Sequence, residues 1–177
     1  MIARTAAIAL LLLTGCVTTS PPVTHVQLTM ASTAAGTAPG PRVLVGAVQV
    51  PDYLLRNQLL RRVDAHAVRY DATASWAEPL DIAVQRVIAG NLAAALDSTA
   101  VMSFPSRSSE DLDWRIEITL RHFEAGARSA RILADLVLAG ADSDTVETWQ
   151  FERERSLPAD SPVAVASTLS ALLGDLS

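Results

Sequence analysis

An alternation of apolar and polar residues over positions 114–121 constrains the fold more than any other feature of this 177-residue sequence. A period of two places one set of side chains in the core and leaves the other in solvent, as in a half-exposed β-strand. The apolar set consists of Trp114, Ile116, Ile118 and Leu120. Two more extended runs follow, so the sequence predicts an antiparallel meander of three strands at 114–123, 128–139 and 145–155.

Shorter strands are expected earlier in the chain. Residues 42–50 are β-branched and almost continuously apolar, which is typical of a central strand covered on both faces. Residues 31–41 have the composition of a flexible loop within one domain. Less regular runs predict a first strand, a pair of short strands joined near Asp64, and a later short strand, at 25–30, 57–63, 65–70 and 101–104.

Two amphipathic helices are predicted. The first begins either at a capping box formed by Ser75 and Glu78 or at Pro79, which suits a first helical position, and both starts stay open. Its apolar stripe comprises Leu80, Ala83, Val84, Val87, Ile88, Ala95 and Leu96, with Asp81, Gln85 and Asn91 off the stripe. The second helix starts after Ser161 as cap and runs to about residue 176, with Val163, Ala166, Leu169, Leu173 and Leu176 facing inward.

This order of elements predicts an α/β fold: a single domain with a mixed, largely antiparallel sheet and two main helices packed on it. Hydrophobic residues make up 50% of the chain and charged residues 19%, which favours a folded domain over disorder. Fourteen basic residues, all arginine, against nineteen acidic ones give a net charge of −5. Nucleic-acid binding is therefore not expected, because it needs a basic surface.

An N-terminal targeting segment precedes this domain. Arg4 is followed by the uncharged run 5–13 and by small residues before Cys16, which is the order of a signal peptide. The apolar run is far shorter than the roughly 20 residues that span a bilayer. We expect residues 1–15 to be a signal peptide, residues 16–24 a lipidated tether, and residues 25–177 the folded domain.

The residues around the only cysteine, Leu13-Thr14-Gly15-Cys16, resemble the lipobox of bacterial lipoproteins. The resemblance implies that the sulfur of Cys16 carries a lipid, that the chain is cut before this residue, and that the new amino group is acylated, for example with palmitate. Several acyl chains make such an anchor stable, because each buried CH₂ contributes roughly 0.8 kcal/mol. The residue after the cysteine is Val17 and not aspartate. In the lipoproteins that this segment resembles, that implies delivery to the outer membrane.

Residues capable of catalysis or metal binding do not form a recognisable motif. His25, His66 and His122 lie on separate predicted strands, and neither a Gly-x-Ser-x-Gly motif nor a lysine-containing phosphate loop is present. The acidic cluster formed by Glu110, Asp111 and Asp113 lies in a serine-rich stretch and is interpreted as a solvated loop. We expect no catalytic residue, no metal and no cofactor, and therefore no enzyme.

Two motifs carry a further resemblance. The segment Val48-Gln-Val-Pro-Asp-Tyr-Leu-Leu-Arg-Asn-Gln-Leu60 ends a predicted strand, and Ser75-Trp-Ala-Glu-Pro-Leu80 opens a predicted helix. In this order, downstream of a lipobox, they resemble the ABC-type transport auxiliary lipoproteins, the paraquat-inducible protein C-like family. The matching positions are Pro51, Tyr53, Leu54, Arg56, Gln58, Leu59, Trp76, Glu78, Pro79 and Leu80.

The resemblance implies an α/β fold and a non-enzymatic outer-membrane subunit that faces the periplasm. Its implied partners are a lipid-binding MCE-domain protein, an inner-membrane permease and an ATPase, which together move lipids or other hydrophobic molecules between membranes. Self-association into a homo-oligomeric ring is a hypothesis that the same resemblance motivates. The alternative function is that of a periplasmic lipoprotein that itself binds a lipid or another apolar ligand.

Contact with the partner is assigned, as a hypothesis, to six motif residues: Pro51, Tyr53, Arg56, Gln58, Trp76 and Glu78. Tyrosine, arginine and tryptophan are the side chains most enriched among interface anchors. A structural interpretation of the same residues stays open at this stage. In it the prolines form turns, the two aromatic side chains belong to the core, and Arg56 and Glu78 form an internal ion pair.

Overall fold

The computed structural model describes residues 21–32, 36–106, 111–141 and 145–177. The expected signal peptide, Cys16 and Glu110 lie outside the described residues. Within them, no helix is long and apolar enough to cross a bilayer.

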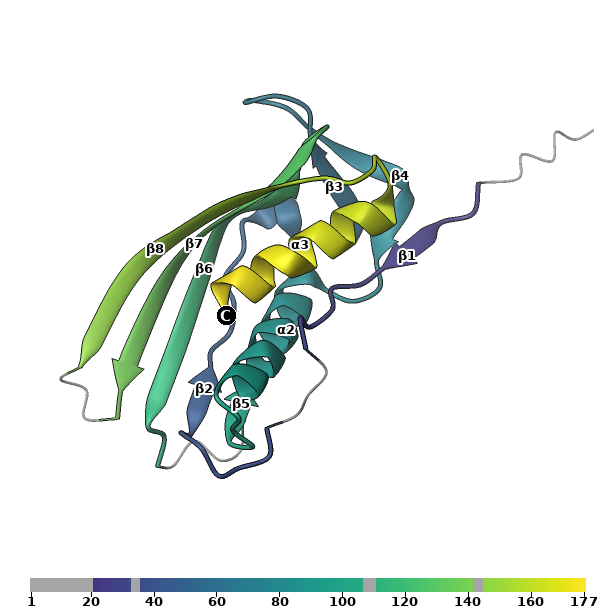
Figure 1. Cartoon of the computed structure of the whole chain (residues 1–177). Helices are drawn as coiled ribbons and strands as arrows, with labels where there is room; N and C mark the ends of the chain where they lie inside the picture. The colour runs from purple at the N-terminus through teal and green to yellow at the C-terminus, as the bar shows by residue number, and fades with distance from the viewer. Residues whose placement is uncertain (1–20, 33–35, 107–110, 142–144) are drawn as a thin grey trace, which may run out of the picture.

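A single mixed sheet of eight strands carries the fold, with two helices packed on one of its faces (Figure 1). This architecture confirms the predicted fold class. The strands are β1 (Thr24–Val26), β2 (Val43–Val45), β3 (Gln58–Arg62), β4 (Val68–Trp76), β5 (Val101–Ser103), β6 (Trp114–Ala125), β7 (Ser129–Gly140) and β8 (Val146–Ser156).

Strand β6 organises the sheet because it pairs along both of its edges. One edge pairs antiparallel with β7, and β7 pairs in turn with β8, which confirms the predicted meander. The other edge receives the segment 43–62 in parallel orientation: β2 first, then a bridge from Gln49 to Thr119, then β3 through Arg61 and Ala125. The sheet continues from β2 to β5, and from β3 to β4 and then β1.

Strand β2 is much shorter than the predicted strand at 42–50. Its three residues are buried between β6 and β5, as expected for a strand inside the sheet. The strand ends at Val45, and the side chain of Gln85 donates hydrogen bonds to the carbonyl oxygens of Val45 (3.1 Å) and of the next residue, Gly46 (2.8 Å). A helix side chain therefore satisfies carbonyl groups close to the point where β2 ends.

Helix α2 (Leu80–Ala95) begins after Pro79, which occupies the N-cap position. The capping-box alternative is wrong, because Ser75 belongs to β4 and no side chain caps this helix. Two further expectations are corrected. Gln85 and Asn91 are buried although they lie off the predicted stripe. Ala95 and Leu96, which the stripe included, are exposed because they lie at the end of the helix.

Helix α3 (Pro162–Leu176) starts as predicted, with the Ser161 hydroxyl accepting a hydrogen bond from the amide of Ala164 at 3.2 Å. The expected inward position of Val163 is wrong, because its side chain is 65% exposed in the first turn. The residues that α3 buries include Val165, Ala166, Leu169, Leu172 and Leu173. Helix α3 packs against α2 and against strands β7 and β8, so the helices cover one face of the sheet and leave the opposite face of β6 to β8 free.

Candidate functional site

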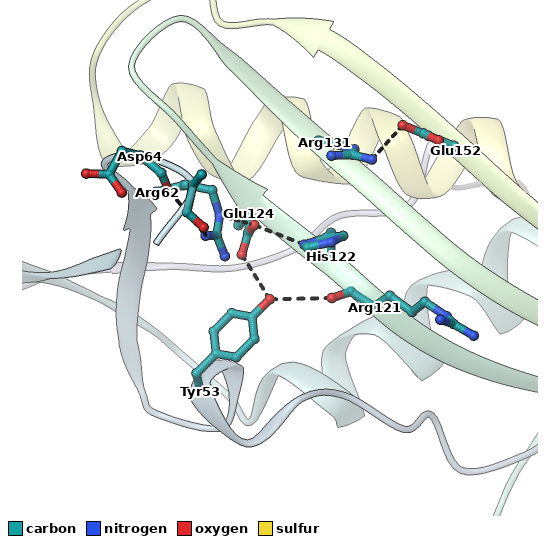
Figure 2. Close-up of polar contacts among 9 residues, drawn as sticks. Tyr53, Arg62, Asp64, Arg121, His122, Glu124, Arg131 and Glu152 are labelled. Atoms are coloured by element: carbon teal, nitrogen blue, oxygen red, sulfur yellow. Dashed lines mark hydrogen bonds and ion pairs between the residues drawn. The ribbon is translucent and has the colours of Figure 1, made fainter. Parts of the chain in front are cut away.

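The first motif forms a turn that connects the two segments running along β6. Pro51 caps a short 3-10 helix, η2 (Asp52–Leu54), with a φ of −59° that proline adopts without strain. Leu54 is buried and fixes this turn to the core. The side chain of Tyr53 then points toward the end of β6 (Figure 2).

The buried carboxylate of Glu124 holds this turn in place. Its Oε2 atom accepts a hydrogen bond from the Tyr53 hydroxyl at 3.1 Å, and its Oε1 atom forms an ion pair with Nε of Arg62 and lies 3.3 Å from Nδ1 of His122. Only 6% of Glu124 is exposed. A charge buried to this degree needs such partners, because an unpaired carboxylate away from water is costly.

Two pKa values in this cluster reflect the arrangement. Burial, followed by the nearby Glu124 charge, raises the pKa of the Tyr53 hydroxyl. The hydrogen bond to Glu124 raises the pKa of Arg62. Tyr53 therefore stays protonated and Arg62 stays charged at neutral pH, so both donate to the carboxylate.

A β-bulge in β6 decides which side chains surround this cluster. The register with β7 shifts between Leu120 and His122, so that Leu120 pairs with Ala134 while His122 pairs with Leu133. The inserted residue, Arg121, and the next residue, His122, consequently both lie on the face that the helices leave free. Without the bulge, His122 would point toward the core.

Shallow pockets of 580 Å³ and 420 Å³ flank His122, which lines both of them. The first is also lined by Pro51, Arg121 and Asp135, and the second by Arg62 and Glu124. We call the surface formed by Pro51, Arg121, His122 and Asp135 the His122 surface. It lies on the helix-free face, and the hydroxyl of Tyr53 donates to the backbone carbonyl oxygen of Arg121 at 3.4 Å beside it (Figure 2).

Polar contacts between strands fix the side chains on this face. Arg121 forms an ion pair with Asp135, which also accepts a hydrogen bond from Gln150 at 3.0 Å. The bond from Gln150, then that from Arg121, lowers the pKa of Asp135. A second pair joins Arg131 to Glu152 at 2.7 Å (Figure 2). Ion pairs and hydrogen bonds between neighbouring strands thus restrict the charged side chains of this face, which suits a binding surface.

The second motif has a different role. Trp76 is buried in the core with 8% of its surface exposed, so in this structure its side chain is not available to a partner. Glu78 forms an ion pair with Arg86, whose guanidinium also donates to the carbonyl oxygen of Leu28 at 3.0 Å. This pair attaches α2 to the chain just after β1. The internal ion pair considered between Glu78 and Arg56 is wrong, because Glu78 pairs with Arg86 instead.

Arg56 and Gln58 lie on another part of the surface. The guanidinium of Arg56 stacks on the ring of Tyr70 at 4.7 Å, and the hydroxyl of Tyr70 donates to the backbone carbonyl of Tyr53 at 2.9 Å. Both Arg56 and Gln58 are exposed and line a third pocket, beside Val23. The six motif residues therefore do not form one site.

The described residues offer little for catalysis or metal binding. No group of three or more histidine, aspartate or glutamate side chains is placed to hold a metal ion among them. Asp111 forms an exposed ion pair with Arg42, and Asp113 accepts a hydrogen bond from the Arg42 backbone amide at 2.8 Å, as in a solvated loop. The most organised polar group is the Tyr53, Arg62, His122 and Glu124 cluster. Arg62, Arg121 and Glu124 could not be predicted as site residues from the sequence, because they belong to no local motif and come together through pairing in the sheet.

The sequence matches the family described as ABC-type transport auxiliary lipoprotein component over residues 26–177. The chain belongs to this family. The auxiliary lipoprotein is also similar in fold to a crystal structure of an uncharacterised protein, with 19% identity, a TM-score of 0.72, and coverage of 88% of this chain and 94% of the other. Protein XCC0632 from Xanthomonas campestris is a second structural relative, with 17% identity, a TM-score of 0.59, and coverage of 88% and 87%. No curated protein sequence matches the chain.

These findings place the auxiliary lipoprotein with the components of ABC-type transport systems. The structural relatives, both below 20% identity, share its overall fold. They confirm the fold class and not a particular partner.

Proposed function

We propose that this auxiliary lipoprotein is a non-enzymatic subunit of an intermembrane transport system for lipids or other hydrophobic molecules. Its lipidated Cys16 anchors it in the outer membrane, and its domain faces the periplasm, where it docks on the MCE-domain component that works with a permease and an ATPase. The observation that carries this proposal is the family match over residues 26–177. The lipobox-like sequence before Cys16 supports the anchor.

Docking is assigned to the His122 surface. Of the six residues that the motifs suggested, Pro51 lies on this surface and Tyr53 supports it through Glu124. Arg121 and His122 extend it, with 59% and 37% of their side chains exposed. Arginine and aromatic side chains held in place before binding lose little entropy on association, which favours them as contact residues.

The experiment is a pull-down of the MCE-domain protein by the full-length, detergent-solubilised lipoprotein. Arg121→Glu combined with His122→Ala should reduce capture at least tenfold, because a reversed charge at an interface typically costs more than about 1.4 kcal/mol. Arg153→Glu is the matched control, since Arg153 lies on β8 against Phe151, on the helix-covered face. If the double variant captured as much partner as the Arg153→Glu control, the assignment of docking to the His122 surface would be rejected. If the unmodified protein captured no MCE-domain protein, the proposed partner would be rejected.

Two further measurements test the rest of the proposal. Cys16→Ala should release the protein from the outer-membrane fraction, and retention after a salt wash would contradict the lipid anchor. Native mass spectrometry of the purified protein should show no tightly held lipid beyond the anchor. A reproducibly bound lipid would favour the alternative, in which the domain itself carries the ligand.

A further inference from the structure

The pocket beside the N-terminal end of the described chain has a composition unlike that of the His122 surface. It measures 550 Å³ and is lined by Val23, Leu55, Arg56, Gln58 and Asp71, among others. Val23 and Leu55 are large aliphatic side chains with 48% and 52% of their surface exposed. Two charged residues of opposite sign and two exposed aliphatic residues thus share one open pocket, which we call the tether pocket.

The tether pocket lies where the chain meets its expected anchor. Val23 directly precedes β1, which among the described strands is an edge strand paired with β4 (Figure 1). Val23 follows Cys16 by seven residue steps. At about 3.3–3.6 Å per extended residue they reach at most about 23–25 Å. A lipid on Cys16 therefore keeps the tether pocket within this distance of a bilayer, while the end of β7 and the start of β8 lie on the other side of the molecule (Figure 1).

The positive group of the pocket is oriented before any ligand binds. The Arg56 guanidinium stacks on Tyr70 at 4.7 Å, which restricts a long and otherwise mobile side chain. A guanidinium stacked through its face keeps its N–H groups at the edge, where they can bind phosphate oxygens in pairs. Arg56 is exposed, so the edge can be reached from solvent.

The negative group is equally fixed. One carboxylate oxygen of Asp71 accepts hydrogen bonds from the amide and the hydroxyl of Thr73, both at 2.8 Å. These bonds, with the nearby charges of Arg69 and Arg61, lower the pKa of Asp71. Asp71 is therefore ionised at neutral pH and can attract an ammonium group.

We propose that the tether pocket binds the zwitterionic phospholipid headgroups of the membrane that holds the anchor. Arg56 contacts the phosphate, Asp71 contacts the ammonium group, and Val23 and Leu55 rest against the region where headgroups meet acyl chains. The inference rests on the proposed lipid anchor. Zwitterionic rather than anionic lipids are favoured because the chain after residue 15 has thirteen arginines and nineteen acidic residues, a net charge of 13 − 19 = −6.

The test uses the full-length lipidated protein in vesicles of phosphatidylethanolamine and phosphatidylcholine with brominated acyl chains, which quench indole fluorescence on contact. Leu55→Trp should be strongly quenched relative to the wild-type chain. Val146→Trp is the matched control, because Val146 is 56% exposed but lies at the far end, on β8. Flotation of the vesicles reports the anchor separately. Protein that floats without extra quenching of Leu55→Trp would overturn this inference and leave the anchor intact, whereas protein that does not float would count against the proposed function.

Charge variants test the headgroup chemistry in the Leu55→Trp background. Arg56→Gln should reduce the equilibrium constant for lipid contact about tenfold, because it replaces a charge-assisted hydrogen bond to the phosphate by a weaker, neutral one. Asp71→Asn keeps an acceptor for Thr73 and should remove the preference for phosphatidylethanolamine over phosphatidylglycerol. Unchanged quenching in both variants would contradict the assignment. An emission shift of the introduced indole on adding the MCE-domain protein, without quenching by lipid, would mean that a protein covers the pocket and would also overturn it.

Discussion

The hydroxyl of Tyr53 donates a hydrogen bond to the buried carboxylate of Glu124, across 71 residues of sequence. This contact connects the turn after β2 to the end of β6, and it lies beneath the surface assigned to docking. The same carboxylate is bound by Arg62 of β3 and approached by His122 of β6. The cluster therefore joins three separate segments through one charge.

Replacement of Tyr53 by phenylalanine tests the contribution of this bond. Tyr53→Phe should lower the free energy of unfolding by about 1–2 kcal/mol, because it leaves a buried carboxylate oxygen short of one donor. Urea denaturation is the measurement. Tyr70→Phe is the control, since it removes a bond of 2.9 Å to a backbone carbonyl and leaves the carboxylate untouched. A Tyr53→Phe variant as stable as wild type would show that the hydroxyl contributes nothing.

The ion pair of Arg62 with Glu124 should behave as a coupled unit. Arg62→Met alone should cost about 2–3 kcal/mol of stability, because it leaves the buried charge with weaker partners. Combined with Glu124→Gln, the loss should be smaller than the sum of the two single losses by about 1 kcal/mol or more. Additive losses in this double-mutant cycle would mean that the pair carries no coupling energy.

Gly36 is predicted to tolerate no side chain. A Cβ atom at this position would lie 2.3 Å from the backbone carbonyl group of Ser98, and backbone cannot move aside cheaply. Gly36→Ala should therefore lower stability by about 1–3 kcal/mol. Gly126→Ala is the matched control, because the nearest atoms to its Cβ lie at 3.8 Å. Equal urea midpoints for the two variants would contradict the predicted clash.

The pair formed by Arg155 of β8 and Asp175 of α3 predicts a dependence of stability on pH. Its two contacts measure 2.7 and 2.6 Å, and the hydrogen bond from Arg155 lowers the pKa of Asp175. The pKa of Asp175 is about 4 in the unfolded chain and lower in the folded protein. The pair therefore stabilises the fold at pH values above the unfolded-state pKa, and this stability is lost as the pH falls through the folded-state pKa.

Asp175→Asn should accordingly reduce stability by about 0.5–1 kcal/mol at pH 7, and the difference from wild type should vanish in acid. Unfolding in urea from pH 7 down to pH 2 measures both. The control is Asp160→Asn, whose parent carboxylate is 80% exposed beside Arg61. A constant difference between wild type and Asp175→Asn at every pH would show that the carboxylate charge is not responsible.

The long elements could be predicted from the sequence because each repeats a pattern many times. The meander from β6 to β8 and helix α3 follow from periodicity and from the Ser161 cap, with boundaries shifted by one or two residues. The short strands could not be delimited in this way. The length of β2 depends on where β5, β6 and Gln85 meet it, and none of these contacts is local in sequence.

The functional surface was the least predictable part. The motif residues could be recognised in the sequence, but whether each is exposed depends on its position in the fold. Trp76 is buried in the core, whereas Arg56 is exposed and stacks on Tyr70. The position of His122 on the helix-free face depends on one inserted residue in β6. Alternation along the sequence predicts the correct face of the sheet for side chains before such an insertion. For side chains after the insertion it predicts the wrong face.

The pairing of β6 along both edges also sets the order in which the chain can fold. Residues 43–62 are made early, yet the strand along which they pair begins only at Trp114 and ends at Ala125. This early segment therefore has no native neighbour on that edge until β6 is available. A chain that stops before Trp114 lacks the strand that joins residues 43–62 to β7 and β8.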